Sequence, residues 1–225
     1  VSLTVHAGEI FGIAGVSGNG QTELVEVLAG QREPNAGTIL VHGEPYTPTR
    51  SEMLHHKVSC LPEEPLRNAC VPSMSVADNL VGRKFDQPGF TVGRGFLNRR
   101  AVRSFAIDLI KRDRIKVPWP DALARTLSGG NVQRMALARE LSGEIEVLIA
   151  ANPCVGLDFA ATSDIRSQLM QARNQGASIL LVSEDLDELF ELADTIVVMF
   201  NGKFVYETPR ASADVSIVGR HMAGH

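Results

Sequence analysis

The chain has 225 residues, a formal net charge of −4 and a sequence pI near 5.9. This length supplies one large α/β domain or a core with a smaller subdomain. Nucleic-acid-binding proteins usually carry a basic balance or clustered Lys and Arg residues, so the acidic balance disfavours such a partner. The three cysteines, Cys60, Cys70 and Cys154, are odd in number and show no paired spacing, which favours a reducing compartment, and they are expected to be small core residues.

The first part of the chain predicts a strand, a glycine-rich loop and a helix in that order. The chain begins at Val1 without a signal peptide, and residues 1–15 are predicted to form strands from the first residue onward. Such a start is expected for a piece of a longer chain. The apolar run at 10–14 leads through Gly, Ser and Asn residues into a helix predicted at 22–28. Further short strands are predicted at 41–44 and 58–61, and helices at 101–112 and 132–141.

The last third of the chain alternates short apolar strands with helices. Strands are predicted at 147–150, 179–182 and 196–199, and helices at 163–174 and 186–192. Uniformly apolar strands that alternate with helices indicate a largely parallel sheet covered on both faces. The sequence therefore predicts an α/β fold of the P-loop NTPase type, with a discontinuous core at 1–66 and 144–225 and a helical subdomain at 67–143.

The segment GVSGNGQT has the spacing of a P-loop, in which backbone N–H groups cradle phosphates and a hydroxyl binds Mg²⁺. Gln21 stands where this pattern has a lysine, so a neutral amide replaces a charge-assisted contact typically worth about 1.5–3 kcal/mol. An ordinary glycine-rich turn is the alternative. The candidate nucleotide-binding residues are Gly15, Ser17, Gly18, Asn19, Gly20, Gln21 and Thr22, with Thr22 as a weak Mg²⁺ ligand.

The segment LSGGNVQR, residues 127–134, resembles the signature motif of the ABC transporter ATPases and opens a helix predicted at 131–141. A serine and two glycines at a helix start leave N–H donors and a hydroxyl aimed at a negative group. A serine N-cap followed by flexible glycines is the alternative. In this family two domains dock head to tail, and the signature of one completes the ATP site of the other. The signature residues here are Ser128, Gly129, Gly130 and Asn131.

The segment VLIAANPCVGLD, residues 147–158, resembles the Walker B strand and the D-loop of the same family. Ala151 stands at the position of the Mg²⁺-associated aspartate, and Asn152 at that of the catalytic carboxylate. Neither the metal nor the attacking water would then meet an anion. Asp158 keeps the D-loop pattern. A buried strand that ends at a proline turn describes the same residues.

Two further positions depart from the family pattern. Glu184, in the segment SEDLDEL, stands where a histidine normally contacts the γ-phosphate, and its ionised carboxylate would repel that phosphate. The alternative is that Glu184 simply belongs to an acidic first turn of a helix. Glu63 follows the strand predicted at 58–61 and takes the place of the Q-loop glutamine.

This selective loss is similar to the second half of the tandem ATPases that serve simple-sugar and nucleoside importers. The resemblance covers nearly the whole chain and includes the segments GRGFLN at 93–98 and GRHMAG at 219–224. It implies a domain that is nearly inactive in isolation, binds ATP and Mg²⁺ weakly or not at all, and supplies its signature in trans. The implied partners are a second ABC domain upstream in the same chain, transmembrane permease subunits and, indirectly, a solute-binding protein. The implied location is the cytoplasmic face of the plasma membrane.

Two other functions remain open. A self-sufficient ABC ATPase would need Asn152 or another group to position water. The replaced positions described above argue against this function: Gln21, Ala151, Asn152, Glu184 and Glu63. A soluble ABC protein of translation or repair would usually carry long insertions, and the acidic balance disfavours nucleic acid.

The adjacent residues His55 and His56, with Cys60 or Cys70, are a conceivable metal site. Neighbouring histidines without a paired ligand motif are more often surface residues, so the sequence favours that interpretation.

Overall fold

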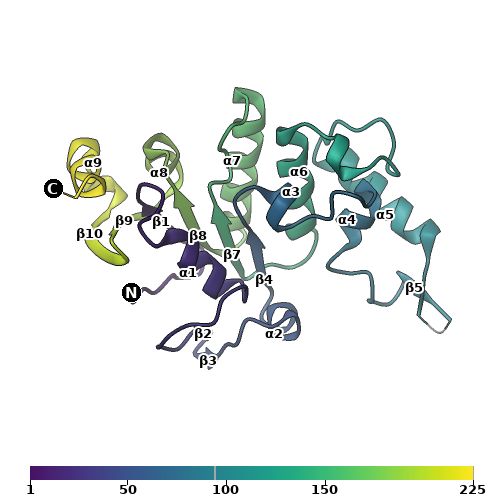
Figure 1. Ribbon diagram of the computed structural model, residues 1–225, viewed down its shortest axis with the longest axis horizontal. Coiled ribbons are helices and arrows are strands. Elements are labelled where there is room, and N and C mark those ends of the chain that lie inside the picture. Colours follow the sequence, from purple (N-terminus) through teal and green to yellow (C-terminus); the bar gives the residue numbers. More distant parts are fainter. Residues whose placement is uncertain (94, 225) are drawn as a thin grey trace. The chain divides into compact units, whose positions relative to one another are not determined.

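The computed structural model describes residues 1–93 and 95–224 (Figure 1). Arg94, which belongs to the GRGFLN segment, and His225 lie outside the described residues. The chain divides into two units. Unit 1 comprises residues 1–62, 144–153 and 166–225, and unit 2 comprises residues 63–143 and 154–165. The domain bounds expected from the sequence, 66/67 and 143/144, stay a prediction.

A six-stranded sheet forms the centre of unit 1 (Figure 1). Its order is β10 (Lys203–Pro209), β9 (Thr195–Phe200), β1 (Ile10–Ala14), β8 (Ser178–Ser183), β7 (Val147–Ala151) and β4 (Val58–Leu61). Neighbouring strands run parallel except for β10, which pairs antiparallel with β9. The predicted α/β fold with a largely parallel sheet is confirmed.

Every residue of β1 and β8 is buried, because both strands are apolar on both faces and lie inside the sheet. Ile13 of β1 pairs with Val182 on one side and Val197 on the other. A Cβ atom on Gly12 would meet the Leu189 Cδ2 atom at 2.8 Å, so helix α8 (Leu186–Leu192) approaches β1 as closely as a glycine allows.

The other helices of unit 1 are α1 (Gln21–Leu28), α2 (Arg50–His55) and α9 (Val215–Met222), with a 3₁₀ turn at Arg210–Ser212. Helix α7 (Phe159–Asn174) runs through both units. A two-stranded hairpin, β2 (Leu40–Val41) with β3 (Glu44–Pro45), precedes α2. In the part of the chain that the structure describes, no helix is both long and apolar enough to cross a bilayer.

Unit 2 is mainly helical and contains α3 (Pro65–Asn68), α4 (Val76–Val81), α5 (Arg99–Arg112) and α6 (Gly129–Glu140). It also holds a 3₁₀ turn at Ala124–Thr126 and a small hairpin of β5 (Thr91–Val92) and β6 (Phe96–Leu97). Its core is built from side chains of α4, α5 and α6, such as Leu80, Val102 and Met135. The Ser75 hydroxyl accepts a hydrogen bond from the Asp78 N–H and so caps α4.

Several local predictions were wrong. Residues 1–9 form no strand, and the strand predicted at 41–44 is a hairpin because His42 and Gly43 adopt positive φ angles of 53° and 79°. Helix α6 begins at Gly129, two residues before the start predicted from the signature motif and three before the start predicted from periodicity. Helix α7 begins four residues early, because Asp158 accepts a hydrogen bond from the Ala161 N–H and caps it.

The three cysteines form no disulfide with one another, and they are only partly buried. Cys60 and Cys70 lie at the margins of the two apolar cores and not inside them. Their assignment as core residues was therefore wrong.

Replacement of Ile13 by alanine should destabilise the protein by about 2–5 kcal/mol, because Ile13 is fully buried and its neighbours on both sides are strands. Urea denaturation followed by circular dichroism measures this change. The control Val205→Ala, at an exposed position of β10, should change stability by less than about 0.5 kcal/mol. Equal effects of the two variants would contradict the central place of β1.

Candidate active site

The loop Gly15–Thr22 connects the carboxyl end of β1 to α1, and its backbone requires glycine. Gly18 and Gly20 have φ angles of 88° and 108°, in the left-handed region that side chains disfavour. A Cβ atom on Gly15 would lie 1.9 Å from the Gln21 Nε2 atom and 2.8 Å from the Met199 carbonyl oxygen. The loop therefore has the close-packed backbone and the helix N-terminus of a phosphate cradle.

Gln21 folds back onto this loop. Its side chain is only 7% exposed, and its Nε2 group donates a hydrogen bond of 3.2 Å to the Val16 carbonyl oxygen. The Gln21 Oε1 atom is buried and has no hydrogen-bond partner among residues 1–93 and 95–224. The first residue of α1 thus carries a neutral amide directed at the loop itself.

Asn19 ties the loop to the turn between β9 and β10. Its Nδ2 group donates to the Val16 carbonyl oxygen at 2.9 Å, and its Oδ1 atom accepts from the Asn201 N–H at 3.0 Å. The Gly202 N–H donates to the Asn19 carbonyl oxygen at 2.8 Å. These bonds give Asn19 a structural role whether or not a ligand is present.

Two other loop residues, Ser17 and Thr22, are exposed. Their hydroxyls can therefore reach a phosphate or a metal ion. Thr22 follows Gln21 in the first turn of α1, at the place where a P-loop supplies its Mg²⁺ ligand.

The end of β7 offers no carboxylate. Ala151 is buried and contributes only a methyl group. Asn152 has a φ angle of 44°, which asparagine tolerates better than most residues, and its N–H donates to the Val182 carbonyl oxygen at 2.8 Å. The Asn152 Oδ1 atom accepts a hydrogen bond of 3.1 Å from the Glu184 N–H. Asn152 thus links the end of β7 to the loop that follows β8.

A buried network fixes the loop that follows β8. The Ser183 hydroxyl donates to the Glu188 carboxylate at 2.7 Å and accepts from the Asp185 N–H at 3.1 Å. The Arg166 guanidinium lies 3.2 Å from the Asp185 carboxylate. The Glu184 side chain is exposed on this loop after β8, so its negative charge faces solvent.

The strand order β1-β8-β7 brings three of these segments to one edge of the unit 1 sheet. Ala14 pairs with Ser183, and Val182 pairs with Ala151, so the three parallel strands end at the same level. The loop after β1, Glu184 and Asn152 therefore follow adjacent carboxyl ends. In open α/β sheets this edge is where ligands bind.

The residues predicted to form the signature motif begin α6 in unit 2. Ser128 is the N-cap residue, and its hydroxyl oxygen accepts a hydrogen bond of 2.8 Å from Asn131 Nδ2. Asn131 Oδ1 accepts from the Lys116 N–H at 2.7 Å, which orients the amide. Ser128 and Gly129 are exposed, and a Cβ atom on Gly129 would meet nothing within 4 Å. The first turn of a helix leaves N–H groups without intrahelical acceptors, so this end can receive an anion.

The two remaining candidates also belong to unit 2. Glu63 is partly exposed, and its carbonyl oxygen accepts a hydrogen bond from Asn68 Nδ2 at 2.6 Å. Asp158 is exposed, and its Oδ1 atom accepts from the Ala161 N–H at 2.8 Å.

Sequence reasoning missed Ser183, Glu188 and Arg166, and it missed the structural roles of Asn19 and Asn152. The Asn-Gly pair at 201–202 signals a turn, but nothing in the sequence shows that Asn19 binds it.

A profile described as ABC transporter matches residues 1–155. The chain belongs to the ABC transporter family. It is 39% identical to a glucose import ATP-binding protein of Haloferax volcanii over its whole length, which is 41% of that relative. It is 32% identical to a guanosine import ATP-binding protein of Bacillus subtilis, again over its whole length and 44% of the relative. The chain spans about two fifths of the length of the curated relatives it matches.

Solved structures share the fold. A nucleotide-free ATP-binding cassette of an ABC transporter superposes with a TM-score of 0.74 at 19% identity, covering 100% of this chain and 88% of the other. A dimeric cassette bound to ADP and Pi superposes with a TM-score of 0.75 at 20% identity, covering 93% and 89%.

Asn152→Ala should remove the acceptor of the Glu184 N–H and place alanine in a left-handed conformation. We expect a loss of stability of about 2 kcal/mol and faster hydrogen exchange at the Glu184 amide. Mass spectrometry of the peptide 181–186 measures the exchange. Asn152→Asp is the matched control, because it keeps the acceptor oxygen and tolerates the backbone angle. Identical exchange in all three proteins would show that Asn152 does not hold this loop.

Proposed function

We propose that this chain is the ATP-binding domain of an ABC importer for simple sugars or nucleosides, with a degenerate site of its own. It supplies its signature residues to the ATP site of a partner domain. The observation that carries this proposal is a contrast between two sets of polar groups. The side chains of Gln21 and Asn152 form hydrogen bonds within the protein, whereas Ser128 and Gly129 are exposed at the start of α6.

The loop after β1 fits a phosphate group only in part. Its glycines, the start of α1 and the exposed hydroxyls of Ser17 and Thr22 suit phosphate oxygens. The lysine charge is missing, because Gln21 is neutral and bonded to Val16. We therefore propose that nucleotide binds this domain weakly.

Mg²⁺ and an attacking water fit the site poorly. Thr22 offers one hydroxyl ligand, but Ala151 offers none. The Asn152 amide oxygen is taken by the Glu184 N–H, and the exposed Glu184 carboxylate would repel a γ-phosphate. Since phosphoryl transfer depends on charge neutralisation and on positioning of the nucleophile, we propose that this domain does not hydrolyse ATP by itself.

The solute class and the partners are proposed from the relatives. Their names describe import of glucose, of nucleosides and of guanosine, and they are more than twice as long as this chain. That extra length can contain a second ABC domain, which would be the partner upstream in the same protein. The proposed assembly also includes transmembrane permease subunits and a solute-binding protein, with this domain on the cytoplasmic face of the plasma membrane. The net charge of −4 supports a protein partner over nucleic acid.

The isolated domain should hydrolyse ATP at the background rate. The triple replacement Gln21→Lys, Ala151→Asp and Asn152→Glu should tighten binding of a non-hydrolysable Mg-ATP analogue by about tenfold or more, since one charge-assisted contact contributes about 1.5–3 kcal/mol. Calorimetry measures the affinity.

Because Ala151 is buried, Gln21→Lys alone is tested as well. Gln31→Lys, at an exposed position just after α1, is the matched control for added charge and should leave affinity unchanged. Turnover by the purified unmodified domain, or no gain from either lysine-bearing variant at position 21, would refute the proposed degenerate site.

Gly130→Asp should reduce ATP turnover of the full-length reconstituted transporter by about a hundredfold, the scale expected when a site loses one anion-stabilising group. The added carboxylate would face the partner's γ-phosphate. The fold should tolerate the change, because a Cβ atom at Gly130 would lie at ordinary distances of 3.6 and 3.7 Å from Ala161 and Leu157. Gln21→Ala should cost much less, because that site already lacks its lysine.

The matched control is Gly143→Asp, at an exposed glycine of the same unit, where a Cβ atom would lie 3.6 Å from Lys84 Nζ. It should leave turnover near the wild-type rate. If Gly130→Asp has no effect, or if Gln21→Ala is equally damaging, the proposed division of labour is wrong.

A further inference from the structure

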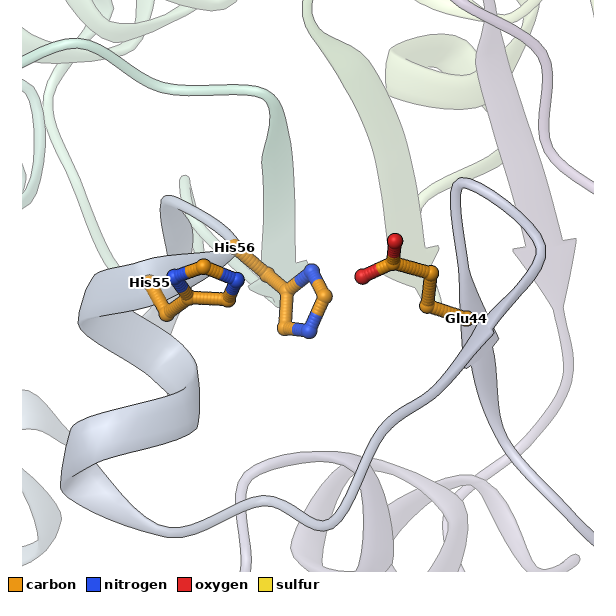
Figure 2. Close-up of side chains that lie close together, drawn as sticks. All are labelled: Glu44, His55 and His56. Atoms are coloured by element: carbon orange, nitrogen blue, oxygen red, sulfur yellow. The ribbon is translucent and has the colours of Figure 1, made fainter.

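Three side chains with metal-binding atoms, Glu44, His55 and His56, gather beside the β2–β3 hairpin of unit 1 (Figure 2). One donor atom from each lies within 4.8 Å of the other two. Within residues 1–93 and 95–224, no other group of three or more His, Cys, Asp or Glu side chains meets the same test. The group contains neither Cys60 nor Cys70, the partners that the sequence suggested for these histidines.

The local backbone brings the three residues together. His55 is the last residue of α2, and His56 is its C-cap residue. Glu44 begins β3 directly after the turn at 42–43, where it pairs with Val41. In Figure 2 the Glu44 carboxylate points from the hairpin toward the His56 ring, and the His55 ring lies on the helix side.

His56 is the fixed member of the group. It is only 7% exposed, and the Tyr46 ring packs against its edge with the ring centroids 5.8 Å apart. Its Nε2 atom lies 3.4 Å from the Glu52 carboxylate, and Glu52 sits one turn earlier on α2. A carboxylate on one ring nitrogen favours the proton there and leaves the other nitrogen, Nδ1, as a metal ligand. Metal-bound histidines commonly have such a carboxylate partner.

We propose that Glu44, His55 and His56 bind a zinc ion, with Glu52 as the carboxylate that orients His56. Two imidazoles and one carboxylate are a ligand set that zinc accepts, and water can fill the fourth position. The carboxylates of Glu44 and Glu52 together balance the two positive charges of the ion.

The required adjustment is small. Donor atoms in a tetrahedral zinc site with bonds of about 2.0–2.1 Å lie about 3.3 Å apart, so the donors here must close by at most about 1.5 Å. Glu44 and His55 are exposed and can make this movement while the buried His56 stays in place.

The site lies away from the proposed nucleotide loop within unit 1. His56 lies two positions before the first residue of β4, so the cluster is at the amino end of that strand. The glycine-rich loop follows the carboxyl end of β1, and β1, β8, β7 and β4 are all parallel. Zinc would therefore join the β2–β3 hairpin to the end of α2 and would not take part in phosphate chemistry.

The test is calorimetric titration of the purified chain with Zn²⁺, together with visible absorption after addition of Co²⁺. We expect about one ion per chain, a higher melting temperature with zinc, and a Co²⁺ spectrum without a thiolate charge-transfer band. Glu52→Gln should weaken zinc binding about tenfold, and His55→Ala and Glu44→Gln should each weaken it by more, up to about a hundredfold. All three positions are at least partly exposed, so these variants should fold.

The matched controls are His6→Ala and Glu33→Gln, which alter an exposed histidine and an exposed glutamate elsewhere in unit 1. Both should bind zinc as the unmodified chain does. Absence of saturable binding, retention of full affinity in His55→Ala and Glu44→Gln, or a thiolate band that Cys60→Ser or Cys70→Ser abolishes would each overturn the proposal.

Discussion

The burial of β1 between β8 and β9 is the constraint on which the rest of unit 1 depends. A strand that is covered on both faces must be apolar throughout, and it must pair on both edges to satisfy its backbone groups. Gly12 allows α8 to pack directly on this strand. Because β1 is held on every side, the loop that follows it begins at a fixed place and in a fixed direction. The same pairing sets the level at which β8 and β7 end.

The side-chain amides of Gln21 and Asn152 make structural contacts at this edge. A glutamine or an asparagine in place of a charged residue would leave a buried amide to be satisfied, and burying such a group without partners costs about 1–3 kcal/mol. The Gln21 Nε2 group donates to the Val16 carbonyl oxygen, and the Asn152 Oδ1 atom accepts from the Glu184 N–H. The Gln21 Oε1 atom, by contrast, accepts no hydrogen bond from any residue that the structure describes. These hydrogen bonds hold both amides to neighbouring parts of the protein itself.

The sequence predicted the regular elements well, because their signals are local. The apolar runs at 58–61, 147–150 and 179–182 correspond to strands whose ends differ by one residue at most, and the helix at 186–192 was placed correctly. The starts of helices that depend on a capping side chain were predicted less accurately. Asp158 caps α7, but an aspartate side chain has several possible partners and does not by itself mark a helix start. The resemblance of LSGGNVQR to the signature motif correctly indicated the family, which periodicity alone does not specify.

Contacts between distant segments were not predictable from one sequence. Asn19 and Asn201 are 182 positions apart, and their hydrogen bond depends on the pairing of β1 with β9. The bond from Glu184 to Asn152 likewise depends on the register of β7 against β8. The approach of Glu44 to His55 and His56 depends on a hairpin turn at His42 and Gly43 that was read as one strand. In each case the side chain's partner is decided by how two backbone segments align, and that alignment has no local signature.

The crowding around Gly15 separates the demands of folding from those of ligand binding. Any larger residue there would strike the Gln21 side chain and the Met199 carbonyl oxygen, so the loop needs this glycine even when no phosphate is bound. A lysine introduced at position 21 would have to displace an amide that already donates a hydrogen bond to Val16, so its effect depends on the loop around it as well as on its charge. A glycine-rich loop with this spacing is therefore evidence of a fold, and it is not by itself evidence of ATP hydrolysis.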